Sequence, residues 1–120
     1  IVTMRDAGNV QEVIEPGVVV INGNRIEAVG RKGSVPVPDG SFLIDVTGMT
    51  IVPGLVDVHA HGAMARSEIL PEQNWMQFSN LAFGVTTIHD PSNDTSSIFA
   101  AAELQRTGGI VAPRILPPSK

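Results

Sequence analysis

With 120 residues, of which 42% are hydrophobic and 17% charged, the chain can form one modest domain with a core and lacks the composition of a disordered segment. Its net charge of −4, without a basic patch and with few aromatic residues, argues against a nucleic-acid surface, and no apolar run reaches the ~18–20 residues of a membrane-spanning helix. The absence of cysteine excludes disulfides, so any metal site must use histidine and carboxylate ligands.

The first half of the chain, residues 1–53, has the pattern of short strands separated by turns. Its clearest unit is the β-branched run VVVI, followed by Asn22-Gly23 and the β-rich run NRIEAV. Asn-Gly between two such runs predicts a hairpin with a type I′ turn, because both residues tolerate positive φ. A further strand is expected at about Phe42–Val46. We therefore expect this half to be all-β, as an open sheet or a portion of a sandwich.

The second half, residues 54–120, alternates between β-rich and helical patterns. The expected elements in chain order are a strand at 54–61, a helix with an apolar stripe at Trp75, Phe78 and Ala82, a strand at 85–89, a second helix and a strand at 110–116. The second helix is expected to contain the apolar residues Ile98, Ala101, Ala102 and Leu104. Asn93 and Asp94 are N-cap candidates for the second helix, and Pro113 weakens the last strand. This alternation predicts parallel strands joined by right-handed crossovers.

Two histidines, His59 and His61, lie two residues apart in the stretch PGLVDVHAHG. In a strand, side chains alternate between faces, so both imidazoles and Asp57 would share one face. Because parallel strands are normally covered by apolar residues on both faces, polar groups there need a partner, and a divalent metal ion would supply one. The spacing alone is equally consistent with two surface or hydrogen-bonded histidines, since His-x-His is a short pattern.

Several stretches, in order, resemble the amidohydrolase superfamily. TIVPGLVDVHAHG is similar to the segment in which that family passes from a small β-sandwich into the first barrel strand, ending in Asp-x-His-x-His. Upstream, GNRIEAVG and LIDVTGMTIVPG resemble the sandwich, and GVTTIHD resembles the second barrel strand. The segment PSNDTSSIFAAAELQRTGGIVAPRI resembles the next helix and third strand, most closely in imidazolonepropionase-like and propeller-fused members.

The resemblance implies an α/β fold with a β-rich N-terminal part: a small β-sandwich portion at 1–53 followed by the first β/α units of an incomplete TIM-type (β/α)₈ barrel at 54–120. It implies a metal-dependent hydrolase of amide or cyclic-amide C–N bonds in small-molecule substrates. One or two divalent ions, zinc first among them, would activate water and polarise the scissile carbonyl. His59 and His61 would be metal ligands, and both cytoplasmic and exported locations stay open.

Three further residues are candidates for supporting the site. Asp57 matches a family position beneath the metal, where it would orient a ligand, or it is a carboxylate paired with a backbone or hydroxyl group. His89 and Asp90 end the second strand at the same mouth of the barrel and are candidates for substrate contact or ligand support. A structural role for His89 is the simpler alternative.

A complete barrel takes about 250 residues, so we expect this chain to be an N-terminal part of such an enzyme. By the resemblance, a Lys or Glu, two further histidines and the base Asp would follow Lys120, leaving no catalytic base here. The chain alone would be inactive and would pair with copies of itself or with the remainder of the protein. The alternatives are a non-catalytic binding or assembly fragment and a related metal-dependent deaminase.

Overall fold

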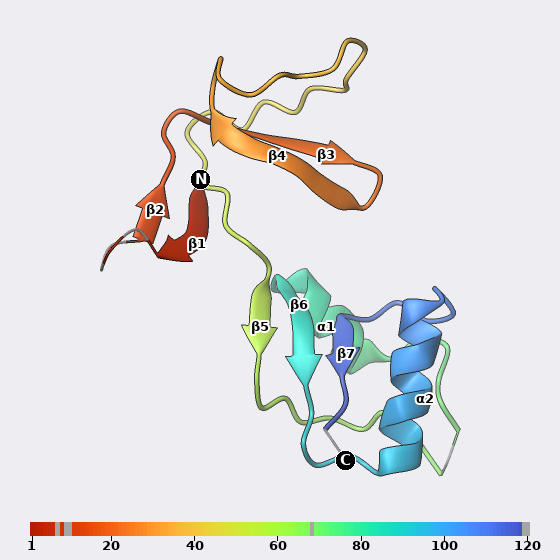
Figure 1. Ribbon diagram of the computed structural model, residues 1–120. Coiled ribbons are helices and arrows are strands. Elements are labelled where there is room, and N and C mark those ends of the chain that lie inside the picture. The colour runs from red at the N-terminus through yellow and green to blue at the C-terminus, as the bar shows by residue number, and fades with distance from the viewer. Residues whose placement is uncertain (7, 9–10, 68, 119–120) are drawn as a thin grey trace. The chain divides into compact units, whose positions relative to one another are not determined.

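The computed structural model describes all residues of the chain except 7, 9–10, 68 and 119–120 (Figure 1). The chain divides into two compact units, Ile1–Pro53 and Gly54–Lys120. Within the described residues, neither helix is long and apolar enough to cross a lipid bilayer. The structure is a small α/β arrangement, with strands in both units and both helices in the second.

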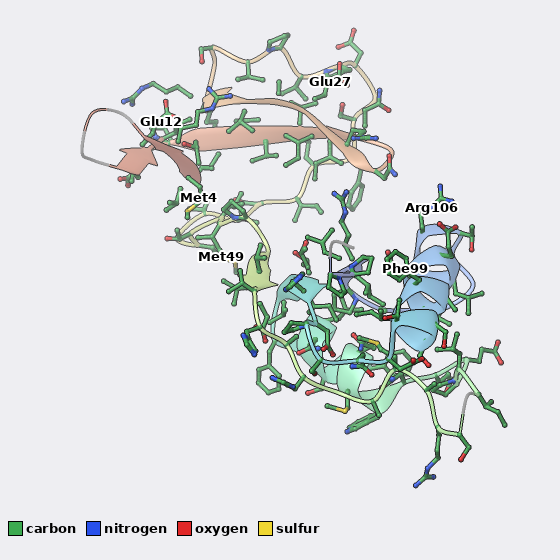
Figure 2. The ribbon with its side chains drawn as sticks, turned by 60° about the horizontal axis from the view of Figure 1, so that its bottom comes forward. Met4, Glu12, Glu27, Met49, Phe99 and Arg106 are labelled. Carbon is green, nitrogen blue, oxygen red and sulfur yellow. The ribbon has the colours of Figure 1, made fainter. Side chains whose placement is uncertain are left out.

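The first unit contains two antiparallel two-stranded ribbons. Strand β1 (Val2–Asp6) pairs with β2 (Gln11–Val13), and β3 (Gly17–Asn22) pairs with β4 (Arg25–Arg31). Thr3 Oγ1 donates a hydrogen bond of 2.7 Å to the carboxylate of Glu12, which Figure 2 labels, and so ties β1 to β2. The amide of Val2 donates to the carbonyl oxygen of Ile51 at 3.0 Å, which brings the end of the unit back to its beginning.

The predicted hairpin is present, but its turn differs from the expected one. Asn22 pairs with Arg25, so the two loop residues are Gly23 and Asn24 rather than Asn22 and Gly23. Of these two, only Gly23 has a positive φ, at 58°. A type I′ turn needs positive φ at both central residues, whereas glycine at the first of them is typical of type II′. A register shift between Val20 and Ile21 accompanies this turn.

The strand expected at Phe42–Val46 was predicted wrongly, because these residues form neither a strand nor a helix. Phe42, Leu43 and Ile44 are 89%, 76% and 74% exposed, respectively. Strand propensity is only a local preference, and a strand exists only where a neighbouring backbone accepts its hydrogen bonds. No described segment of the first unit pairs with this run.

The second unit is built on a three-stranded parallel sheet, as the alternating pattern predicted. Its strands are β5 (Leu55–Asp57), β6 (Val85–His89) and β7 (Arg114–Leu116), in the order β5-β6-β7. Their arrows run the same way in Figure 1, so the segments that follow β5 and β6 leave from the same edge of the sheet. Helix α1 (Trp75–Ala82) packs against β6, and α2 (Thr95–Arg106) packs against β7.

Two of these strands are shorter than predicted. Strand β5 ends at Asp57 instead of running to residue 61, because the Asp57 carboxylate accepts the backbone amide of His59 at 3.0 Å. An aspartate that binds the amide two residues on forms a turn and competes with the strand ladder. Strand β7 begins at Arg114, directly after Pro113, which has no amide to donate to a neighbouring strand.

The core of the second unit lies between the sheet and α2. Its buried side chains are Ala60, Met64, Ile88, Ile98, Ala101 and Ile115. Helix α2 buries Ile98 and Ala101 of the predicted face, with Ala102 partly buried beside them, whereas Leu104 is 37% exposed. Asp94 caps its N-terminus by accepting the amide of Ser97 at 2.9 Å.

The apolar stripe predicted for α1 is not the face that this helix buries. Trp75 is 80% exposed and Ala82 is also exposed, so only Phe78 of the stripe is half-buried. Gln77 is the buried residue of this helix, and its side chain lies 3.4 Å from the sulfur of Met64. In helix α2, the C-terminal residue Arg106, which is labelled in Figure 2, forms a surface ion pair with Glu103 at 2.7 Å.

Candidate metal and catalytic site

The candidate site lies where β5 and β6 end. His59 and His61 follow β5, His89 is the last residue of β6, and Asp90 comes directly after it. The backbone amide of Ala60 donates to the carbonyl oxygen of His89 at 2.9 Å, so the two chain segments stay paired beyond β5. The carboxyl ends of parallel strands are where α/β barrels place their functional residues.

The rings of His59 and His61 lie side by side. Their centroids are 5.0 Å apart, their planes are inclined by 36°, and both side chains are exposed. The route to this arrangement differs from the predicted one, because His59 lies in a turn after β5 and not within a strand. The Asp57 side chain creates that turn by binding the His59 amide, so Asp57 shapes the backbone on which the pair stands.

His89 is half-buried, and its side chain contacts the backbone of Val58, the residue before His59. Its Nδ1 lies 3.2 Å from the carbonyl oxygen of Val58. A carbonyl oxygen only accepts hydrogen bonds, so Nδ1 of His89 carries the proton in this contact. The structure thus places His89 against the backbone that precedes His59.

Asp90 is completely buried, and hydrogen-bond donors surround its carboxylate. Its Oδ1 accepts the amides of Ser92 and Asn93, at 2.8 and 3.1 Å, and the Ser92 hydroxyl at 2.9 Å. Its Oδ2 accepts the side-chain amide of Asn93. Burial raises the pKa of Asp90, but the hydrogen bonds from Ser92 and Asn93 together lower it further, so the pKa lies below the ordinary value of 3.8.

Ser92 and Asn93 connect Asp90 to the histidine segment. Ser92 Oγ lies 2.8 Å from Nδ1 of His61. The Asn93 side chain donates to the carbonyl oxygen of Gly62 and accepts the amide of Met64 at 3.4 Å. The segment after β6 therefore holds the segment after β5 through both side chains and backbone.

The structure places the rings of His59 and His61 side by side, connects His61 to Asp90 through Ser92, and sets His89 against the backbone before His59. The contributions of Ser92 and Asn93 were missed, since helix capping was preferred for Asn93 over a place at the mouth of the barrel, and Ser92 was not singled out. A signal was present: Asp-Pro-Ser-Asn directly after a strand is rich in side chains that bind nearby backbone amides. In the described part of the chain, no three His, Cys, Asp or Glu residues form a metal-ligand group.

Comparison with known proteins gives partial matches to named enzymes. A 5-methylthioadenosine/S-adenosylhomocysteine deaminase from Moorella thermoacetica is 36% identical over 70 residues, which are 54% of this chain and 16% of that protein. An imidazolonepropionase from Rubrobacter xylanophilus is 41% identical over 63 residues, 49% of this chain and 15% of that protein. An enamidase from Eubacterium barkeri is 31% identical over 78 residues, 63% of this chain and 20% of that protein.

The chain thus spans less than a quarter of the length of these relatives. No protein-family profile matches it, and no solved structure matches it. The three relatives are members of the amidohydrolase superfamily, the family that the sequence resembles. Partial stretches of this chain are homologous to enzymes of the amidohydrolase superfamily.

Proposed function

We propose that this chain supplies the first part of a metal-dependent amidohydrolase that hydrolyses C–N bonds of amide or cyclic-amide type in small molecules. His59 and His61 would be two ligands of a divalent ion, zinc first. The observation that carries the proposal is the pair of exposed imidazoles, 5.0 Å apart, at the carboxyl edge of a parallel sheet. The homologous stretches in named deaminases and hydrolases support it.

The two histidines fit such an ion. Two imidazoles bound to one zinc ion with Zn–N distances of about 2.0–2.1 Å have ring centres about 5 Å apart, close to the separation of these two rings. Nitrogen donors suit zinc, and a chain without cysteine leaves histidine and carboxylate as its ligands. The remaining ligands, a Lys or Glu and two histidines, are assigned by the family resemblance to later barrel strands.

The fold proposal follows the same lines. The β5-α1-β6-α2-β7 order with parallel strands supports reading residues 54–120 as the start of a TIM-type barrel. The two antiparallel ribbons support reading residues 1–53 as a portion of the β-sandwich that accompanies the barrel. Both units would be completed by other parts of the protein or by other copies of the chain.

In the proposed mechanism, the residues of this chain bind the divalent ion and orient its ligands. They do not accept the proton of the coordinated water. A bound divalent ion would lower the pKa of a coordinated water and polarise the substrate carbonyl. His59 and His61 would hold the ion, and Asp57 and His89 would fix the backbone around His59 through the His59 amide and the Val58 carbonyl. The general base would be an aspartate of the last barrel strand, as the family resemblance implies.

A second candidate function is a related deaminase that uses the same site. Several of the partially matching relatives are named 5-methylthioadenosine/S-adenosylhomocysteine deaminase, which favours this candidate. The two functions differ in product: deamination releases ammonia, whereas hydrolysis of a cyclic amide opens the ring without ammonia.

The deciding experiment starts from the natural reading frame that contains this chain. We expect the encoded protein to carry a Lys or Glu, two histidines and an aspartate on later strands. The purified protein should then be assayed, with zinc, for ammonia release from 5-methylthioadenosine and for ring opening of imidazolonepropionate. His59→Asn and His61→Asn should each abolish activity. A reading frame without those later residues, or a protein with neither metal nor hydrolysis, would instead support a non-catalytic binding or assembly role.

A further inference from the structure

A chain of hydrogen bonds runs from the buried interior to the ring of His61. Ser92 Oγ lies 2.8 Å from Nδ1 of His61 and 2.9 Å from Oδ1 of Asp90. Asp90 is 0% exposed, so water does not compete for its carboxylate. A serine hydroxyl has only one proton, and it can donate that proton to only one of these two neighbours.

The hydroxyl proton of Ser92 points to Asp90 and not to His61. An ionised carboxylate is only an acceptor, and Oδ1 of Asp90 already faces the backbone amides of Ser92 and Asn93. Two bare oxygens 2.9 Å apart would repel each other, so the hydroxyl donates to Asp90. Ser92 Oγ must then accept a hydrogen bond from the Nδ1–H of His61. In the neutral ring, the free electron pair is consequently on Nε2.

We infer that Ser92, itself held by Asp90, is a positioning residue that fixes His61 in the Nδ1–H tautomer and presents its Nε2 to a divalent cation. The part that concerns the cation rests on the proposed function; the part that concerns the tautomer does not. Metal-binding histidines commonly donate their other ring N–H to a protein group, which fixes the tautomer and the ring orientation. Here that group is the hydroxyl of Ser92, and the Asp90 carboxylate binds this hydroxyl and not the histidine itself.

The neighbouring backbone supports this role. Asn93 donates to the carbonyl oxygen of Gly62, the residue after His61, and the amide of Ala60, the residue before it, donates to His89. The backbone on both sides of His61 is therefore held to the segment that carries Ser92. With the backbone held, the contact between Nδ1 and Oγ sets the direction of the ring.

The chain contains three histidines, which makes the tautomer measurable in one spectrum. Long-range 1H–15N correlation spectra in alkaline buffer, where imidazoles are neutral, identify the protonated nitrogen of each ring. His89 is an internal reference for Nδ1–H, because its Nδ1 faces the Val58 carbonyl. His59 is a reference for a ring without a hydrogen-bond partner among the described residues, since the contact found for its side chain is the His61 ring, with centroids 5.0 Å apart.

We expect His61 of the wild-type chain to show the Nδ1–H pattern of His89. Ser92→Ala should move His61 to the pattern of His59, and Ser92→Thr, which keeps the hydroxyl, should preserve the wild-type pattern. If Ser92 only stabilised the loop, Ser92→Ala would change stability and leave the His61 tautomer alone. A wild-type His61 protonated on Nε2, or a tautomer that Ser92→Ala leaves unchanged, would overturn the inference.

Adding zinc to the same samples separates this inference from the proposed function. We expect zinc to shift the Nε2 resonances of His59 and His61, and we expect Ser92→Ala to weaken zinc binding by about 10- to 100-fold. If the tautomers behave as expected but zinc leaves the wild-type spectrum unchanged, even in the full-length protein that adds the later ligands, the role of Ser92 stands and the proposed metal site fails. If zinc binds equally to the wild type and to Ser92→Ala, the positioning of Nε2 for the cation is overturned.

Discussion

The side-chain amide of Asn93 donates to the carbonyl oxygen of Gly62, and the Asn93 side-chain oxygen accepts the amide of Met64. Asn93 alone thus holds two backbone groups of the segment that carries the histidine pair. Asn93 also donates to Asp90, so the buried carboxylate and the histidine segment share a single side chain.

Asn93→Ala should therefore loosen the segment after β5. We expect the free energy of unfolding of the second unit to fall by about 1–3 kcal/mol, because a donor and an acceptor are left without partners. Urea unfolding followed by far-UV circular dichroism measures this, since both helices lie in the second unit. Faster amide exchange at Met64 should accompany it.

The matched control for that change is Asn80→Ala on α1, because the Asn80 side chain makes no hydrogen bond to another described residue. It should leave stability unchanged or raise it slightly, because alanine is the better helix former. Equal losses for the Asn80 and Asn93 variants would contradict the role assigned to Asn93.

Stability should fall in acid through Asp90. Its pKa in the folded chain lies below the ordinary value of 3.8, so the folded state binds fewer protons than the unfolded state around that pH. The contribution of Asp90 is fully present above pH 3.8 and is lost as the pH falls through the folded-state pKa. A carbon-13 titration of the Asp90 carboxyl group should give a midpoint below 3.8. A midpoint above that value would show that burial outweighs the hydrogen bonds.

Gly54→Ala should destabilise the start of β5. A Cβ on Gly54 would lie 2.0 Å from Oγ1 and 2.8 Å from Cβ of Thr86 on the adjacent strand, so the strands would have to separate. We expect a loss of about 1–3 kcal/mol in the free energy of unfolding, typical of an overfilled site. In a double-mutant cycle, Thr86→Gly should recover part of this loss. Additive losses in the double variant would mean that the two residues do not collide.

Zinc binding should depend on both histidines of the pair. His59→Asn and His61→Asn should each remove the zinc-induced shift of the ring that remains, because neither imidazole retains a second ligand beside it. His89→Asn should weaken binding less, since the His89 ring faces the Val58 carbonyl. Zinc binding that survives the loss of His61 but not of His89 would reassign the site.

Self-association is the expected fate of the exposed run Phe42, Leu43 and Ile44. Three consecutive, largely exposed apolar residues favour contact with another apolar surface. Sedimentation equilibrium should show association that Phe42→Ser with Ile44→Ser reduces. Val37→Ser, at a side chain that is only 43% exposed, should change it much less. Association that is unaffected by the double substitution would point to the strand edges instead.

Local patterns were enough to predict much of the fold. The β-branched run Val85–Ile88, the helical spacing of Ile98 and Ala101, and the position of Asp94 before the helix each predicted what the structure contains. In these segments, local preference and tertiary packing favour the same conformation. Phe42–Val46 shows the limit, because its residues favour a strand but no described neighbour pairs with them.

The positions of the candidate residues along the chain could be predicted from the sequence, whereas the hydrogen bonds between them could not. His59, His61, His89 and Asp90 were expected at the ends of adjacent strands, and parallel strands bring such ends together. The hydrogen bond between Nδ1 of His61 and Oγ of Ser92 spans 31 residues of sequence, so no local pattern could reveal it. The assignment of His59 and His61 to a metal ion stays a prediction.

The exposure of Trp75 has a practical consequence for every experiment on this chain. It is the single tryptophan, and the chain has no tyrosine, so Trp75 dominates the intrinsic fluorescence. Because its side chain is 80% exposed, the indole emits from a watery environment in the folded state, and unfolding changes the emission colour little. A blue shift of that emission would instead report that another molecule or segment has covered the start of α1, so Trp75 fluorescence can detect binding at this surface.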